Sequence, residues 1–131
     1  MKKPSLQYSL TCLGVDERHG PPSFNYVFYR LPLASFPYRF PADAGFFLVN
    51  AWCDGEGEFK QRVVITAPDG QTTLLDTGQR PFKLESPRAL DQSIWFLQGF
   101  SFPVAGFYPV KVYLEDQVVL EYAIEAYETP S

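Results

Sequence analysis

Histidine, cysteine and charged residues are all scarce in this sequence. Its 131 residues include one histidine, two cysteines and 20% charged residues. A structural zinc site takes four cysteine or histidine ligands, which this chain cannot supply. The sequence also lacks the Gly-x-Ser-x-Gly, His-Glu-x-x-His and Gly-Lys-Ser/Thr motifs of hydrolases, metalloproteases and nucleotide-binding proteins. We therefore expect no metal, no cofactor and no enzymatic activity.

Positive charge and long apolar runs are missing as well. The formal net charge is -4, whereas proteins that bind nucleic acid present a basic surface. No segment approaches the roughly 20 apolar residues of a membrane-spanning helix. The basic pair Lys2-Lys3 is not followed by the apolar core of a signal peptide. We expect a cytoplasmic protein that binds neither nucleic acid nor membranes.

Aromatic residues and proline, in contrast, are abundant. The chain has 12 Phe, 8 Tyr, 2 Trp and 12 Pro, and 46% of its residues are hydrophobic. This is enough apolar material for the core of a single domain over residues 1–131, and the prolines disfavour long helices. Apolar side chains recur at every second position in Leu6, Tyr8, Leu10 and Cys12. That period is typical of a half-buried strand.

Turn residues separate many such segments along the chain. Pro68-Asp69-Gly70 indicates a tight turn, because proline presets φ and glycine takes the left-handed position. Short strands with turns between them indicate a sandwich or barrel, and segments that are apolar on both faces favour two packed sheets. We predict an all-β fold, a two-sheet antiparallel β-sandwich of immunoglobulin-like architecture with about nine strands. The expected strands span residues 6–12, 24–31, 46–53, 59–67, 72–76, 82–85, 94–100, 107–115 and 118–127.

Three turn and corner motifs carry a resemblance to a known family. They are the turn Gly55-Glu56-Gly57-Glu58, the turn that follows Ala67, and the corner Gly106-x-Tyr108 before the last hairpin. Over roughly residues 6–126 the chain resembles a widespread prokaryotic family of small β-sandwich domains of unassigned function. The resemblance implies a sandwich in which the Tyr108 hydroxyl caps a corner, as in immunoglobulin-like domains. It implies no catalytic residues.

The histidine and the cysteines fit structural roles. His19 lies in a loop rich in proline and glycine at residues 16–22, where we expect it to be solvated. Cys12 and Cys53 lie in apolar segments, either as buried thiols or as a disulfide. A cytoplasmic location favours the thiols, because that compartment is reducing.

Two alternative functions depend on carboxylates and tryptophans. Asp54, Glu56 and Glu58 on one turn could converge on Ca²⁺, which takes 6–8 oxygen ligands, or supply the carboxylate pair of a hydrolase. A turn is equally a place for solvated charges. Trp52 and Trp95 could stack on sugar rings, but their apolar strands favour packing in the core. A Ca²⁺- or carbohydrate-binding module is thus the first alternative, and a carboxylate-dependent hydrolase is the second.

The stretch from Phe96 to Tyr108 is unusually aromatic. Strand alternation cannot bury all of its rings in one core, so some either cap the end of the sandwich or form an exposed patch. We single out Phe100, Phe102 and Phe107 as the candidate patch. We therefore predict a non-enzymatic protein-binding or scaffold module, whose partner is another protein or a second copy of the chain.

Overall fold

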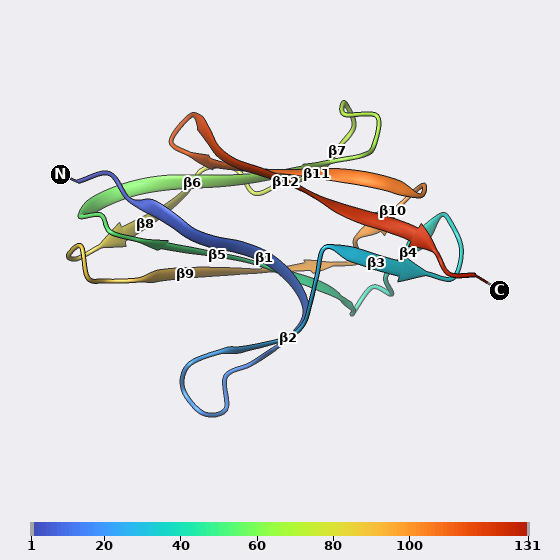
Figure 1. Ribbon diagram of the computed structural model, residues 1–131, viewed down its shortest axis with the longest axis horizontal. Coiled ribbons are helices and arrows are strands. Elements are labelled where there is room, and N and C mark those ends of the chain that lie inside the picture. The colour runs from blue at the N-terminus through green and yellow to red at the C-terminus, as the bar shows by residue number, and fades with distance from the viewer. Residues whose placement is uncertain (1, 131) are drawn as a thin grey trace.

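The computed structural model describes residues 2–130, and all regular structure in this part of the chain is β-strand (Figure 1). Its strands are β1 (Ser5–Asp16), β2 (Ser23–Phe28), β3 (Arg30–Leu33), β4 (Tyr38–Arg39), β5 (Gly45–Cys53), β6 (Gly57–Thr66), β7 (Thr73–Asp76), β8 (Arg80–Leu84), β9 (Asp91–Gln98), β10 (Ser101–Phe102), β11 (Gly106–Leu114) and β12 (Gln117–Glu128). The predicted all-β class is confirmed. Nothing in the described residues forms a helix long and apolar enough to cross a bilayer.

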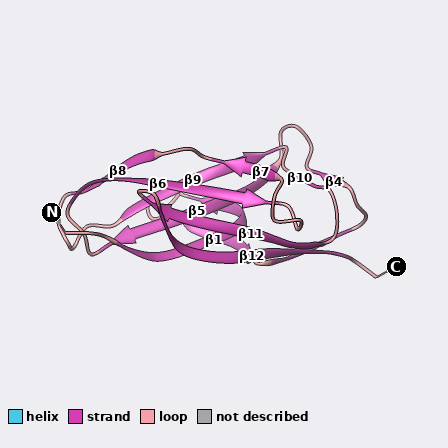
Figure 2. Ribbon diagram, turned by 90° about the horizontal axis from the view of Figure 1, so that it is seen from above, coloured by secondary structure: helices cyan, strands magenta, loops and turns pink. Residues whose placement is uncertain are grey.

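The strands form three sheets rather than two. A four-stranded sheet has the order β2-β1-β5-β9, and a six-stranded sheet has the order β3-β12-β11-β6-β7, with β8 beside β6. The short strands β10 and β4 make the third sheet. Figure 2 shows β7, β8 and β9 along one long side of the molecule, with β4 and β10 near one end of that side. Two strand edges from different sheets therefore lie on the same side.

The strand count of about nine is too low for two reasons. The segment 24–31, expected as one strand, changes sheets near Tyr29. Its first part, β2, pairs with β1 in the four-stranded sheet, whereas β3 pairs with β12 in the other. The β3–β12 pair is parallel, so the prediction of wholly antiparallel sheets is also wrong. The two-residue strands β4 and β10 lie in segments where prolines hide any alternation.

Alternate side chains of the two large sheets meet in one hydrophobic core. Phe46 and Leu48 of β5 contribute from the four-stranded sheet, and Val63 and Ile65 of β6 contribute from the six-stranded sheet. All four side chains are fully buried. The sequence period of two thus places one face of each sheet against the other.

A buried polar network interrupts this core. Gln61 of β6 points inward, and its Oε1 accepts hydrogen bonds from Trp52 Nε1 at 2.7 Å and from Asn50 Nδ2 at 3.1 Å. Its Nε2 donates to Ser93 Oγ at 2.7 Å. One glutamine therefore connects the six-stranded sheet to two strands of the four-stranded sheet. Asn50 Oδ1 is buried and has no hydrogen-bond partner among the described residues.

Tyr108 closes a corner of the fold through its hydroxyl. The side chain is fully buried at the start of β11. Its Oη donates to the carbonyl oxygen of Val104 and accepts from the Val104 amide at 3.2 Å. The corner role implied by the Gly106-x-Tyr108 motif is confirmed. Gly106 has a φ of 147°, which a residue with a side chain rarely adopts.

Candidate functional site

Two of the three phenylalanines predicted to form an exposed patch are buried. Phe100 is 7% exposed and Phe102 is fully buried, whereas Phe107 is 60% exposed. Phe102 belongs to β10, whose pairing with β4 closes this corner over the end of the core. Its ring lies 6.0 Å from that of Phe46 and 5.0 Å from that of Tyr108. The predicted patch is therefore wrong for Phe100 and Phe102, which cap the core, and Phe107 stands alone.

The three carboxylates of the β5–β6 turn do not converge. Asp54 forms an exposed ion pair with Lys2, with an Nζ–Oδ1 distance of 2.8 Å. Glu58 lies opposite Lys83 where β6 pairs with β8, and Glu56 is exposed. No group of three His, Cys, Asp or Glu side chains in the described part of the chain could hold a metal ion. The turn supplies no observation that favours a Ca²⁺ site or a hydrolase.

The two tryptophans belong to the core rather than to the surface. Trp52 is fully buried, and its ring stacks on Phe82 with centroids 5.2 Å apart. Trp95 is half-buried and packs against the same core. The interpretation of both as core residues is confirmed. Trp52 therefore offers no face on which a sugar ring could stack.

The cysteines are free thiols at opposite ends of the β1–β5 pair. Cys12 lies opposite Phe47, whereas Cys53 lies opposite Ser5. This separation excludes the disulfide alternative, because a disulfide needs neighbouring Cα atoms. Burial raises the pKa of the Cys12 thiol, which disfavours its reactive thiolate form. His19, as expected, is exposed in the loop between β1 and β2.

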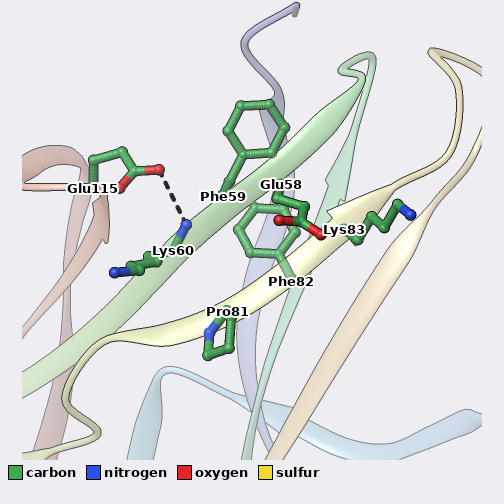
Figure 3. Close-up of a pocket in the computed structure, with 7 residues that line it drawn as sticks. All are labelled: Glu58, Phe59, Lys60, Pro81, Phe82, Lys83 and Glu115. Carbon is green, nitrogen blue, oxygen red and sulfur yellow. Dashed lines mark hydrogen bonds between the residues drawn. The ribbon is translucent and has the colours of Figure 1, made fainter.

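A shallow depression of about 460 Å³ lies over β6 and β8 (Figure 3). It is lined by Glu58, Phe59, Lys60, Pro81, Phe82, Lys83 and Glu115. The two phenylalanine rings belong to the core and are nearly inaccessible. The two lysines balance the two glutamates in charge. This depression therefore has no net charge to select a ligand.

A second hollow, which we call the edge groove, is more distinctive. It measures about 490 Å³ and lies between β7 of one sheet and β9 of the other. β7 contributes Leu74 and Leu75, and β9 contributes residues 96–98. The turn after β9 contributes Gly99 and Phe100, β10 contributes Ser101, and β4 contributes Arg39. The groove thus combines leucine and phenylalanine side chains with polar groups and one cation. Arg39 is exposed and makes no ion pair within the described chain.

The strand β9 is an open edge beside this groove. Among the described residues β9 pairs with β5 alone, so one side of its backbone has no strand partner. Residues 91–98 contain no lysine, arginine or proline, the residues that usually protect edge strands from pairing. Phe96 in its middle is 44% exposed. The open strand edge and the edge groove therefore form one continuous surface.

A comparison with family models places the chain among relatives. A model described as a family of unknown function, DUF6941, matches residues 7–126. The chain belongs to this family. The resemblance to a family of small domains of unassigned function is therefore confirmed. No curated protein matches the sequence.

Part of the edge groove was visible in the sequence and part was not. Phe96 and Phe100 belong to the unusually aromatic stretch from Phe96 to Tyr108, and both line the groove. Leu75 and Arg39 lie on separate strands more than twenty residues away, and nothing in their local sequence indicates that they share a surface with Phe96. Only sheet order shows that β9 is an edge. An apolar run without charge at residues 94–97 was the one available signal.

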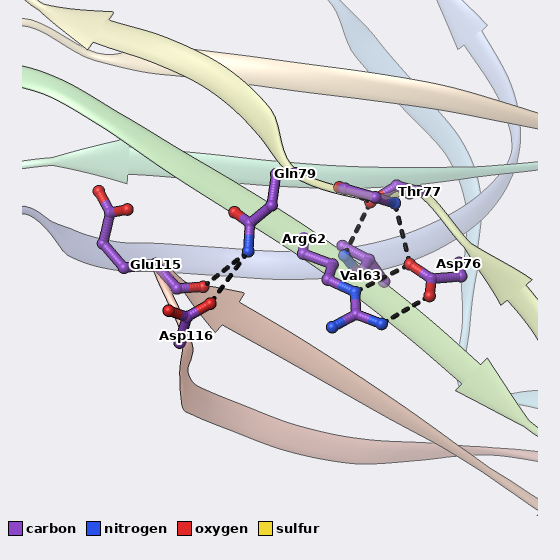
Figure 4. Close-up of polar contacts among 8 residues, drawn as sticks. Arg62, Val63, Asp76, Thr77, Gln79, Glu115 and Asp116 are labelled. Atoms are coloured by element: carbon purple, nitrogen blue, oxygen red, sulfur yellow. Dashed lines mark hydrogen bonds and ion pairs between the residues drawn. The ribbon is translucent and has the colours of Figure 1, made fainter.

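Polar contacts also organise the side of the six-stranded sheet that faces away from the core (Figure 4). Arg62 of β6 binds Asp76 of β7 through two hydrogen bonds of 2.9 and 2.6 Å. The amide of Gly78 donates to the same carboxylate at 2.9 Å. Nearby, Gln79 Nε2 donates to Asp116 Oδ1 at 3.3 Å. The Arg62 contact and the Gly78 amide lower the pKa of Asp76 to about 2.

This shift predicts how the Asp76 pair responds to acid. A carboxylate whose pKa is lower in the folded state stabilises the fold above its unfolded pKa of 3.8 and loses that contribution as the pH falls through about 2. Because both side chains are more than one-third exposed, the contribution is at most about 1 kcal/mol. Asp76→Asn is expected to flatten the decline in the free energy of unfolding over that range. Urea unfolding at several pH values measures it, and an equally steep decline in the variant would contradict it.

Proposed function

We propose that this domain is a non-enzymatic protein-binding or scaffold module that binds an extended protein segment along β9. The observation that carries the proposal is the continuity of an unpaired strand edge with the edge groove. A segment added beside β9 would gain backbone hydrogen bonds, and the groove would accept one of its side chains. The backbone supplies affinity in this mode, and the pocket supplies selectivity.

The composition of the edge supports this mode of binding. Exposed edge strands tend to aggregate unless charge, proline or a covering segment protects them. β9 has a central run of Ile94, Trp95, Phe96 and Leu97 without such protection. A partner that normally covers this edge would protect the protein from aggregation. Arg39 at the rim would orient the partner by pairing with a carboxylate.

We also propose that the fold is immunoglobulin-like and that the protein is cytoplasmic. The two large sheets would form an immunoglobulin-like sandwich, to which β4 and β10 add a small flap. The Tyr108 corner supports this, because a tyrosine hydroxyl bonded to an upstream backbone group recurs in such domains. Two free thiols support a reducing, cytoplasmic location.

Selection from a phage-displayed library of random ten-residue peptides tests the binding mode. Enriched peptides are expected to be apolar at alternate positions. The Phe96→Lys variant is expected to bind them at least about tenfold more weakly than the wild type does. Val118→Lys is the matched control, because Val118 is 48% exposed and Phe96 44% exposed on strands of different sheets. The control should bind within about twofold of the wild type. The proposal would be overturned if the selected peptides bound the Phe96→Lys variant as tightly as the wild type, or if no peptide bound at β9.

A further inference from the structure

We propose that the partner at β9 is a second copy of this chain, joined by antiparallel pairing of the two β9 strands about a twofold axis at Trp95. The inference rests on the proposed function, since it names the occupant of the same edge. It would merge the two four-stranded sheets into one continuous sheet. Closed twofold symmetry of this kind is the commonest arrangement of soluble homo-oligomers.

Symmetry restricts how two β9 strands can pair. A twofold axis perpendicular to the sheet keeps both cores on the same side, so each core-facing residue must lie opposite another core-facing residue. In β9 the core-facing residues include Ser93, Trp95 and Leu97, which lie opposite the buried Asn50, Leu48 and Phe46 of β5. Ile94 and Phe96 face outward. An axis at Trp95 satisfies the requirement.

The outward side chains complement one another in this register. Ile94 of each copy lies opposite Phe96 of the other, so the half-exposed ring gains an apolar neighbour. Gln92 lies opposite Gln98, which pairs amide with amide. Cross-strand pairs of these kinds stabilise a sheet. The strand thus matches its own reversed sequence, with apolar residues in the centre and polar residues at the ends.

The backbone groups needed for this pairing face the open edge. The Gly99 amide donates to the Ala44 carbonyl at 2.8 Å, which continues the register of β9 with β5. Because amide directions alternate along a strand, odd-numbered residues of β9 turn their backbone groups toward β5. The even-numbered residues 92, 94, 96 and 98 turn theirs outward. In the proposed register residue 92 lies opposite residue 98 and residue 94 lies opposite residue 96, so their outward backbone groups can form hydrogen bonds with each other.

Opposite charges lie near the two ends of β9, with Asp91 at its first residue and Arg39 of β4 near its last. The register places Asp91 of one copy opposite Gly99 of the other. Gly99 and Arg39 line the same edge groove, and the neighbouring Phe40 amide donates to the Phe100 carbonyl at 3.0 Å. The unpaired guanidinium of Arg39 would therefore meet the carboxylate of Asp91. Two such contacts form, one at each end of the interface.

A second open edge, the first half of β12, does not complement itself in this way. β3 covers β12 only at residues 125–128, which leaves its first half open with Val118 and Leu120 exposed. Every symmetric register centred on residue 118, 119, 120 or 121 places Glu121 opposite or diagonal to an acidic residue of the second copy. Such like-charge pairs oppose association. Self-complementarity therefore favours β9 over β12 as the shared edge.

Sedimentation velocity over a concentration series tests the second copy directly. The wild type is expected to pass from the mass of one chain to that of two. Amide hydrogen exchange on the same samples should show residues 92, 94, 96 and 98 becoming protected as concentration rises. This measurement needs no variant, so it stays decisive even if a substitution affects folding. A chain that stays monomeric, or amides that exchange equally at all concentrations, would overturn the inference.

Three variants then test the register. Phe96→Lys sets two ammonium groups diagonally across the axis and is expected to raise the dissociation constant at least about tenfold, whereas Val118→Lys should leave it unchanged. Arg39→Glu should weaken the dimer by about threefold or more, and adding Asp91→Lys should recover the loss. Dissociation by Val118→Lys but not by Phe96→Lys would overturn the inference. A monomer whose β9 still binds selected peptides would overturn the second copy alone and leave the proposed function standing.

Discussion

Replacing Trp52 with alanine is expected to lower the free energy of unfolding by about 3–5 kcal/mol. The side chain is fully buried between the sheets, and its ring stacks on Phe82. Removing it leaves a cavity that the neighbouring strands cannot fill, because their positions are set by sheet hydrogen bonds. It also removes a hydrogen-bond donor from Gln61 Oε1. Few substitutions in the chain should cost as much.

Urea unfolding followed by far-ultraviolet circular dichroism measures this loss. Phe107→Ala is the matched control, because that ring is large and aromatic but 60% exposed. The control is expected to change the free energy of unfolding by no more than about 0.5 kcal/mol. Similar losses in the two variants would show that Trp52 does not pack as described.

Gln61→Met is expected to cost about 2–4 kcal/mol, although methionine matches glutamine in length. The loss has a different origin from that of Trp52→Ala. Methionine fills the space, but it accepts no strong hydrogen bond, so the Trp52 indole and the Asn50 amide become buried donors without an acceptor. Each such group costs roughly 1–3 kcal/mol. The variant therefore separates lost hydrogen bonds from lost volume.

A double-mutant cycle with Trp52→Phe resolves the indole contribution. Phenylalanine has no ring N–H, so Gln61→Met should cost less in that background, by about 1–2 kcal/mol. Gln79→Met on the exposed surface is the control, with an expected change within about 0.5 kcal/mol. A Gln61→Met variant as stable as the wild type would mean that the network contributes nothing net, as happens when buried polar groups merely offset their own desolvation.

The binding surface shows why site prediction from this sequence succeeded only in part. The composition of the stretch from Phe96 to Tyr108 predicts an exposed aromatic patch, but Phe100 and Phe102 cap the core. Their burial depends on the pairing of β10 with β4, two-residue strands that no periodicity can reveal. The exposed ring of the stretch that lines the groove is Phe96. Its significance depends on β9 being an edge strand, which is a property of sheet order rather than of β9 itself.

The sequence alone determined the all-β class, most strand positions and the core role of Trp52, and the family resemblance implied the corner role of Tyr108. The strand positions follow from local physics, because the period of two and the turn residues act within a few residues. Tertiary structure alone decided that residues 24–31 divide between two sheets, that β3 and β12 run parallel, and that Leu75, Phe96 and Arg39 line one groove. A strand's own residues specify which face is apolar, but its partners depend on contacts between distant segments.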